Sequence, residues 1–389
     1  MRTRRLVVVP SEPIEAYEAA GYGSWLARYY NPGGYFHEVY ALSPLESGER
    51  SAHGMVVMGV AERDLAGVLE RLRPDVVRAY GGYWPADYAV AGRVAGIPVV
   101  VSVHDSSAGS IHESVGLADV VLCVSRVVMD RVLALGCAPA GVRLLPNRVD
   151  TKRFAPRRPA PEAAAHGRAF PPGKHILHVG RKSHEKNIDT VVRALGHLPP
   201  DYSCIFIGRD APDPYRLLAR REGVAGRCFW IESVPNDSLP IWYNWCDCLC
   251  VPSRWEGFGI VFLEAAACGT PIVTSDIAPM NEYLEDGVSA RLVSAYEDPV
   301  RVADAIRSVC EDPGLRTILT EGGVRAARPF DVAAVDACEV GIYADVIEGR
   351  LGQPPDPAAV RAWRSKRSRG RWPTWLRAAA RLLHAEESR

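Results

Sequence analysis

The sequence predicts an α/β protein of two domains, and three observations lead to this prediction. Short apolar runs typical of buried parallel strands alternate with helix-forming stretches. The length of 389 residues is sufficient for two domains of ordinary size. Near the middle, residues 157–173 are rich in Pro, Ala and Gly, as in an interdomain linker. We therefore predict a first domain at 1–156 and a second at 174–329.

The first domain is predicted to be a doubly wound sheet. Its strands are expected at residues 6–9, 38–42, 75–80, 97–103 and 119–125, and its helices at 11–30, 64–72, 85–95 and 126–135. In such sheets ligands bind beyond the carboxyl ends of the strands. His104 directly follows one of these strands, so it lies where a ligand is expected. The alternative is a histidine with a purely structural role at a strand end.

The second domain repeats the alternation of strands and helices. Its strands are expected at 175–179, 202–207, 227–231, 247–251 and 271–276, and its helices at 188–195, 260–267, 298–310 and 313–325. Residues 330–350 are predicted to form a closing helix, and residues 351–389 a basic tail that contains tryptophan.

A glycine turn after the strand at 247–251 is the centre of the predicted site. Gly257 and Gly259 allow the backbone to turn tightly and to approach a ligand closely. A helix begins at Ile260, directly after the turn. Free N–H groups and the helix dipole favour an anion at such a helix N-terminus. The pattern therefore predicts a phosphate site.

Two carboxylates, Glu256 and Glu264, flank this turn eight residues apart. On one helix they would be about 12 Å apart, which exceeds the roughly 5–9.5 Å of paired glycosidase carboxylates. We expect them to contact different parts of one long ligand: Glu264 a ribose diol, and Glu256 a second sugar. The alternative is that Glu256 caps the helix and Glu264 is a solvated helix residue.

Two cations follow the strand at 175–179. Arg181 and Lys186 flank a turn at its carboxyl end, where a guanidinium fork and an ammonium suit a diphosphate. Two solvated surface cations are the alternative interpretation. The loops after strands 202–207 and 227–231 include Val234, a candidate for packing on a nucleobase.

Composition excludes several classes of protein. The net charge of zero argues against a general polyanion binder, and no nucleic-acid partner is expected. The chain has no run of 18 apolar residues, and its basic start is too short for a signal peptide. Cys246, Cys248 and Cys250 alternate without a usual zinc spacing, so we expect buried thiols in a reducing cytoplasm. The sequence carries no indication of the oligomeric state.

The motifs together resemble a known family. Pro252-Ser253 followed by Glu256-Gly257-Phe258-Gly259 and Glu264, then Gly269-Thr270-Pro271, resembles the retaining nucleotide-sugar glycosyltransferases of family 4. Gly-Arg-x4-Lys at 180–186 and Pro-Asn-x-Val-Asp at 146–150 extend the resemblance, although Arg148 replaces the family's usual glycine. The resemblance implies the GT-B fold, with two Rossmann-like domains facing a cleft and a C-terminal helix that crosses back to the first domain.

The resemblance also implies residue roles. It assigns catalysis to His104, Glu256, Arg181 and Lys186. It assigns donor binding to Arg181, Lys186, Val234, Glu256, Gly257, Phe258, Gly259, Ile260 and Glu264. No Asp-x-Asp metal motif appears, so we expect no metal and no cofactor besides the nucleotide-sugar donor.

The implied reaction is transfer of a sugar, with retained configuration, from a UDP- or GDP-linked donor to an acceptor hydroxyl. Glu12, Glu15 and Glu18 would suit a cationic small acceptor such as an aminocyclitol, as in antibiotic biosynthesis. A polysaccharide or lipid-linked glycan is the other acceptor class. A nucleotide-sugar epimerase and a non-catalytic nucleotide-binding partner remain alternatives.

The tail leaves two interpretations open. Residues 357–389 hold nine Arg or Lys against two acids, with three Trp interleaved, and residues 374–384 are predicted to be helical. Basic residues with tryptophan fit peripheral contact with an anionic membrane surface. A solvated charged flank of a cytoplasmic protein is the alternative.

Overall fold

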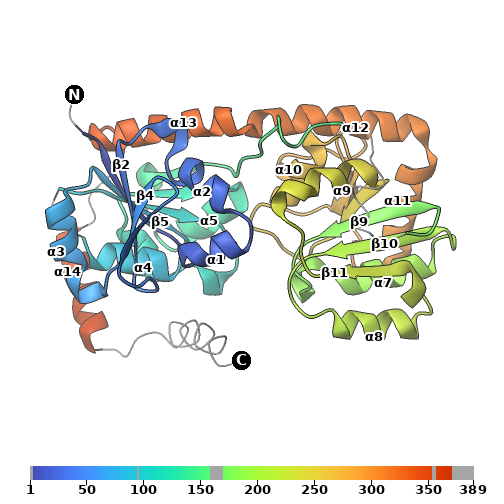
Figure 1. Ribbon diagram of the computed structural model, residues 1–389, viewed down its shortest axis with the longest axis horizontal. Helices are drawn as coiled ribbons and strands as arrows, with labels where there is room; N and C mark the ends of the chain where they lie inside the picture. Colours follow the sequence, from blue (N-terminus) through green and yellow to red (C-terminus); the bar gives the residue numbers. More distant parts are fainter. Residues whose placement is uncertain (1–2, 94–95, 158–169, 353–355, 370–389) are drawn as a thin grey trace. The chain divides into compact units, whose positions relative to one another are not determined.

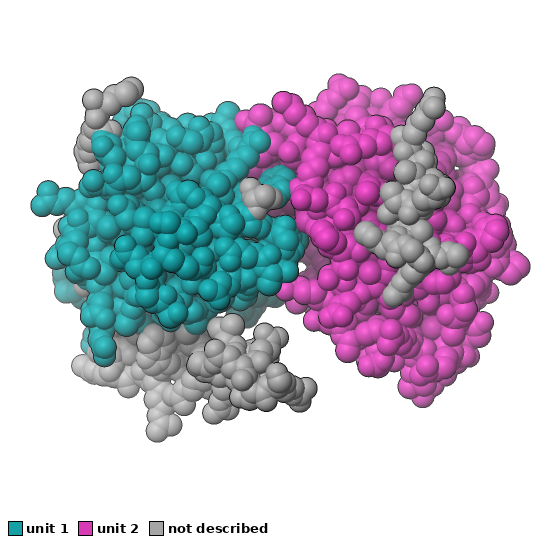
Figure 2. All heavy atoms as spheres, in the orientation of Figure 1, with its two compact units in different colours: residues 1–145, 336–389 teal, residues 146–335 magenta. Residues whose placement is uncertain are grey.

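The computed structural model describes residues 3–93, 96–157, 170–352 and 356–369. The chain divides into two compact units, residues 1–145 with 336–389, and residues 146–335 (Figure 2). This division lies before the predicted domain boundary at 156, because the segment after Pro146 pairs with the second unit. Val149 N donates to Phe330 O, and Val332 N to Val149 O, both at 2.9 Å. The predicted linker lies mostly outside the described residues.

The first unit is built on one mostly parallel sheet with the strand order β3-β4-β2-β1-β5-β6-β7-β8 (Figure 1). Its strands are β1 Arg5–Val9, β2 Glu38–Ser43, β3 Glu49–Ala52, β4 Met55–Gly59, β5 Val76–Tyr80, β6 Val99–Val103, β7 Val120–Cys123 and β8 Val142–Leu144. Its helices are α1 Ile14–Ala19, α2 Gly23–Tyr30, α3 Glu62–Leu72, α4 Trp84–Ala91, α5 Arg126–Ala134 and α14 Pro357–Arg369. Every residue of β5 and β6 is buried, as expected for strands covered on both faces.

Two local features of this unit differ from the sequence-based expectation. The single helix expected at 11–30 is two helices, α1 and α2, because Gly21 adopts a φ of 80° between them. The antiparallel pair β3–β4 was not predicted. Its two-residue turn, His53-Gly54, has positive φ at both positions, the geometry that matches the twist of a hairpin.

Helix α13, Val332–Ile347, is the predicted closing helix, and the first unit includes it from Asp336 onward. A buried ion pair anchors it to the sheet of that unit. Arg78 of β5 donates to Glu339 at 3.3 Å, and the Tyr343 hydroxyl donates to the same carboxylate oxygen at 3.0 Å. Both charged side chains are almost completely buried, so each depends on the other for its charge to be compensated.

The second unit contains a parallel sheet with the strand order β11-β10-β9-β12-β13-β14 (Figure 1). Its strands are β9 Lys174–Val179, β10 Tyr202–Ile207, β11 Cys228–Ile231, β12 Cys248–Val251, β13 Ile272–Ser275 and β14 Arg291–Val293. Its helices are α7 Ile188–Gly196, α8 Asp213–Arg221, α9 Leu239–Trp245, α10 Ile260–Ala267, α11 Pro299–Glu311 and α12 Pro313–Ala327. Because β9 and β12 are parallel neighbours, the loops that follow them meet at one edge of the sheet.

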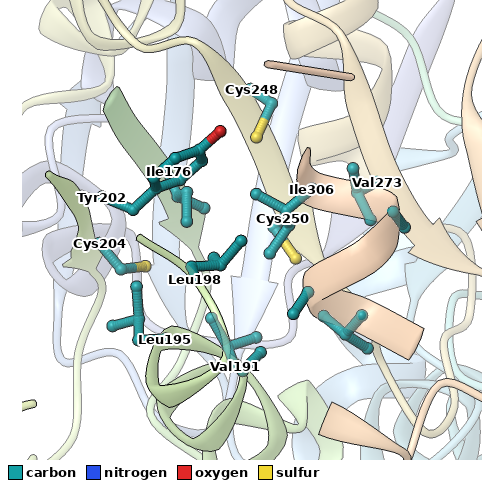
Figure 3. Close-up of a cluster of buried hydrophobic side chains, with 14 of the residues drawn as sticks. Ile176, Val191, Leu195, Leu198, Tyr202, Cys204, Cys248, Cys250, Val273 and Ile306 are labelled. Atoms are coloured by element: carbon teal, nitrogen blue, oxygen red, sulfur yellow. The ribbon is translucent and has the colours of Figure 1, made fainter. Parts of the chain in front are cut away.

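The hydrophobic core of this unit packs helices against the strands of the sheet and so holds the strands in place. Figure 3 shows Val191 and Leu195 on one helix, Cys248 and Cys250 on a strand, and Ile306 on a second helix, gathered into one apolar cluster. Cys246 is buried as well, which agrees with the expectation of buried thiols. Burial raises the pKa of the Cys246 and Cys250 thiols, and a hydrogen bond with Cys310 together with burial raises the pKa of Cys248, so all three act as small apolar side chains. Cys338 on α13 differs, since it is exposed.

Among the described residues, no helix is both long and apolar enough to cross a membrane. The helix predicted at 374–384 lies outside the described residues.

Candidate functional site

The loop after β9 carries the two predicted cations. It begins at Gly180, and β10 ends beside it, since a Cβ on Gly208 would lie 1.8 Å from the carbonyl oxygen of Gly180. Position 208 must therefore be glycine for the two loops to approach this closely. Arg181 has a side chain that is 58% exposed, and its ion pair with Glu185 at 2.8 Å is a surface contact. Its guanidinium therefore remains accessible to a ligand.

Lys186, at the other end of this loop, forms the buried centre of the site. Its Nζ lies 2.7 Å from Oε1 of Glu256 and 3.0 Å from Oε1 of Glu185. Burial lowers the pKa of Lys186, but its attraction to and hydrogen bonds with these two carboxylates outweigh burial and raise the pKa overall. Lys186 is therefore a fixed ammonium at neutral pH.

Glu256 belongs to the loop after β12, and its side chain is buried. Its Oε1 accepts hydrogen bonds from Lys186 Nζ and from the Ser253 hydroxyl, the latter at 2.8 Å. These two bonds hold the carboxylate at the same edge of the sheet as the loop after β9, residues 180–187, which we call the cationic loop. The loop after β12, residues 252–259 (the acidic loop), is thus joined to the cationic loop within this unit.

The turn at 257–259 opens helix α10. Gly259 adopts a φ of 81°, and a Cβ there would lie 2.5 Å from the Phe262 ring. Phe258 is buried and stacks on Tyr283 at 5.1 Å, while the Tyr283 hydroxyl donates to Phe258 O at 2.8 Å. Because the helix begins after a glycine, no side chain at its N-cap can accept from its first amides. Ile260, the first helical residue, is 39% exposed.

Glu264 lies further along α10, where its carboxylate is buried. The Tyr243 hydroxyl donates to its Oε2 at 2.8 Å, and the side chains of Asn236 and Arg153 are also close enough to affect it. Burial raises the pKa of Glu264 to about 7, although these three neighbours oppose the rise. Near neutral pH the carboxyl group is therefore partly ionised. Hydrogen-bond donors from a ligand would increase the ionised fraction.

The structure brings together some of the predicted residues. Arg181, Lys186, Glu256 and the 257–259 turn follow neighbouring strands of the second sheet. Val234 is half-buried between β11 and Asn236, the residue whose side chain hydrogen bonds to Glu264. His104 belongs to the first unit, where it is half-buried at the carboxyl end of β6.

Sequence reasoning missed the side chains that hold the two glutamates. Ser253 stood within the quoted motif, but nothing in the pattern assigned its hydroxyl to Glu256. Tyr243 lies on α9 and Asn236 in the short turn before it, and neither segment carries a motif that would place these side chains beside Glu264. In the described part of the chain, no cluster of three or more His, Cys, Asp or Glu side chains is arranged to hold a metal ion.

Comparison with known proteins identifies the family. Residues 33–153 match the family model described as Glycosyltransferase Family 4, and residues 162–325 the model described as Glycosyl transferases group 1. A D-inositol 3-phosphate glycosyltransferase of Acidothermus cellulolyticus is 31% identical over 314 residues, which are 71% of this chain and 68% of that relative. The chain belongs to glycosyltransferase family 4. The prediction of an enzyme that transfers hexosyl groups is thereby confirmed.

Other glycosyltransferases are similar to this one over most of its length. The mannosyltransferase LpsB of Rhizobium meliloti, named for lipopolysaccharide core biosynthesis, is 30% identical over 232 residues, or 55% of this chain and 65% of the relative. The crystal structure of Anabaena HepE in complex with UDP and glucose covers 88% of this chain and 100% of its own, with a TM-score of 0.71 at 17% identity. WaaG, with a TM-score of 0.65 at 16% identity, covers 87% of this chain and 99% of its own. These structures confirm the predicted GT-B fold.

Proposed function

We propose that this glycosyltransferase uses a nucleoside diphosphate sugar, preferably UDP-linked, and transfers the sugar with retained anomeric configuration to an acceptor hydroxyl. The observation that carries the proposal is the buried Lys186–Glu256 pair at 2.7 Å, beside a helix that begins at a positive-φ glycine. HepE, which shares the fold, binds UDP and glucose, and this supports the choice of UDP.

The reaction breaks the bond between the anomeric carbon and the diphosphate oxygen and forms one to the acceptor oxygen. The acceptor proton leaves to the departing diphosphate or to solvent. Negative charge grows on the diphosphate as the bond breaks, and Lys186, Arg181 and the first amides of α10 would offset it. Glu256 would orient the transferred sugar, and Glu264 would accept from the ribose hydroxyls.

For the acceptor, we propose a cyclitol or cyclitol phosphate. The names of the 31%-identical relatives support this class. The acidic residues that suggested a cationic acceptor are partly neutralised within the chain. Glu15 and Glu18 lie 3.9 and 3.7 Å from Arg50, and Glu18 lies 2.7 Å from His53. Arg50 is shared with a third carboxylate, Glu46 at 3.8 Å, so the region is compensated only in part and does not by itself select a cationic acceptor. A lipid-linked glycan is the second candidate, favoured by the likeness to LpsB and by the basic tail.

Nucleotide binding is the first test of the proposal. UDP at about 100 times its dissociation constant should stabilise the protein by roughly 2.7 kcal/mol, which a thermal-shift titration detects easily. GDP, ADP and TDP at the same concentration are the comparisons. A shift with GDP instead of UDP would correct the donor class. The absence of a shift with every nucleotide would refute the proposed donor site.

Turnover is expected to be independent of metal, because Lys186 and Arg181 supply the positive charge that a divalent ion would otherwise bring to the diphosphate. Incubation with excess EDTA should change the transfer rate by less than about twofold, which is small compared with the effect of removing a catalytic group. Loss of turnover that Mn²⁺ or Mg²⁺ restores would contradict this prediction.

The alternative of an epimerase is tested separately, by incubation with the donor alone. A new sugar nucleotide formed without any acceptor would indicate an epimerase.

A further inference from the structure

Asn187, directly after Lys186, has an unusual combination of backbone and side-chain features. Its φ and ψ are 55° and 37°, in the left-handed region. Its side chain is completely buried. Asparagine tolerates this conformation better than most residues, but glycine adopts it without any side-chain constraint. The geometry of the turn therefore does not by itself explain why a buried amide occupies this position.

The amide of Asn187 joins three separate segments. Its Nδ2 donates to Pro252 O and to Tyr296 O, each at 2.9 Å. The Thr190 hydroxyl donates to its Oδ1 at 2.6 Å. Because the oxygen accepts from Thr190 and the nitrogen donates to two carbonyls, the amide has one orientation that satisfies all three bonds.

These bonds bear directly on the Lys186–Glu256 pair. Pro252 immediately precedes Ser253, the residue whose hydroxyl donates to Glu256. On the other side, Nε2 of the buried His178 lies 3.2 Å from the carbonyl oxygen of Lys186. Burial lowers the pKa of His178 to about 4, so this histidine is neutral and its Nε2–H can donate to the carbonyl. The backbone of Lys186 is thus fixed by its own carbonyl and by the residue that follows it.

We propose that Asn187 is a positioning residue that ties the cationic loop to the acidic loop and thereby fixes Lys186 and Arg181 for contact with the diphosphate of the donor. The inference rests on the proposed function, since it concerns the same donor site. Asn187 touches neither substrate nor reacting atoms, and it acts through Lys186 and the Pro252 carbonyl.

Asn187→Gly is the decisive variant, because glycine adopts the left-handed backbone conformation but lacks the side-chain amide that hydrogen bonds to Pro252 O and Tyr296 O. UDP and UMP binding to the full chain would be measured by calorimetry. The diphosphate depends more on Lys186 and Arg181 than the monophosphate does. We expect the affinity for UDP to fall about tenfold, the equivalent of roughly one hydrogen bond, and the affinity for UMP to change less than about twofold.

Two further variants distinguish a specific loss of UDP binding from a general loss of stability. Thr190→Val retains Asn187 but frees its amide to rotate, and we expect a smaller loss that is again selective for UDP. Ile306→Ala removes a buried side chain of α11 from the core cluster. It should lower the melting temperature without changing the ratio of UDP to UMP affinity.

The outcomes separate the inference from the proposed function. If the unmodified protein binds UDP and Asn187→Gly loses UDP and UMP affinity equally, or loses neither, the positioning role is refuted while the donor site stands. If Asn187→Gly does not fold, an unchanged UDP-to-UMP ratio in Thr190→Val refutes the role. If the unmodified protein binds no nucleoside diphosphate, both proposals fail.

Discussion

Replacement of Lys186 by methionine is expected to lower kcat about 10²- to 10³-fold, the range seen when one preorganised donor to a developing negative charge is removed. Methionine retains most of the length of the lysine side chain but not its charge. The ammonium is buried and held 2.7 Å from Glu256, so solvent cannot readily replace it. Initial rates at saturating donor and acceptor would measure the effect.

Lys186→Met should also destabilise the second unit by about 3–5 kcal/mol, because it removes the ammonium that hydrogen bonds to the buried Glu256 carboxylate. The double variant Lys186→Met with Glu256→Gln removes both charges. We expect it to recover most of the free energy of unfolding but none of the activity. Recovery of both would mean that the pair serves stability, and would refute the catalytic role of Lys186.

Lys174→Met is the matched control. Lys174 is also in an ion pair, with Asp247 at 3.4 Å, but it lies at the amino end of β9 and its side chain is 37% exposed. A half-exposed pair contributes at most about 1 kcal/mol. The control should therefore retain activity and lose little stability. A loss of activity equal to that of Lys186→Met would show that the effect of Lys186→Met is not specific to the donor site.

The fold was predictable where strands are fully buried and helices are amphipathic. The runs that became β6 and β10 are apolar except for one serine each, and that of β5 is apolar except for Arg78, so their positions follow from the sequence within a few residues. The β3–β4 hairpin was harder, because β3 is the exposed sequence Glu-Arg-Ser-Ala, without the alternation of a half-buried strand. Its His53-Gly54 turn was the available signal.

The site was predictable to the extent that its residues stand in motifs at strand ends. Lys186 and Glu256 were predicted as site residues in this way, and the adjacency of β9 and β12 brings them into contact. The partners of Glu264 could not be found, because Tyr243 contacts it through the packing of α9 on α10, 21 positions away in sequence. The role of Asn187 was hidden for the same reason, since its carbonyl partners lie 65 and 109 positions away.

Replacement of Glu264 by glutamine is expected to weaken UDP binding about 10- to 100-fold, because hydrogen bonds to a charged acceptor contribute about 1.5–3 kcal/mol. The carboxylate form accepts from ribose hydroxyls better than the neutral acid does. Since the pKa of Glu264 is raised to about 7 without ligand, UDP affinity should rise as the pH increases through 7 and then level off. Glu264→Gln should lose the part of this pH dependence that Glu264 contributes.

The terminal phosphate of UDP titrates near pH 6 as well, by analogy with other phosphomonoester groups of pKa about 6. The useful quantity is therefore the ratio of UDP to 2′-deoxy-UDP affinity, in which the phosphate contribution cancels. This ratio should increase with pH in the unmodified protein and stay constant in Glu264→Gln. The control is Glu311→Gln, because the Glu311 carboxylate also accepts a hydrogen bond from a tyrosine hydroxyl, that of Tyr202 at 3.0 Å. In this control the affinity ratio should still increase with pH.

Stability should respond to Glu264 in the opposite direction from UDP binding. The folded-state pKa of about 7 exceeds the ordinary value of 4.5, so the folded unit holds this proton more tightly than the unfolded chain does. The corresponding stabilisation is complete below the ordinary pKa and is lost as the pH rises through about 7. Without ligand, Glu264→Gln should therefore gain stability relative to the unmodified protein across this interval. If urea denaturation shows no such gain while the UDP ratio still depends on pH, another group must supply that dependence, and the assignment of Glu264 to the ribose fails.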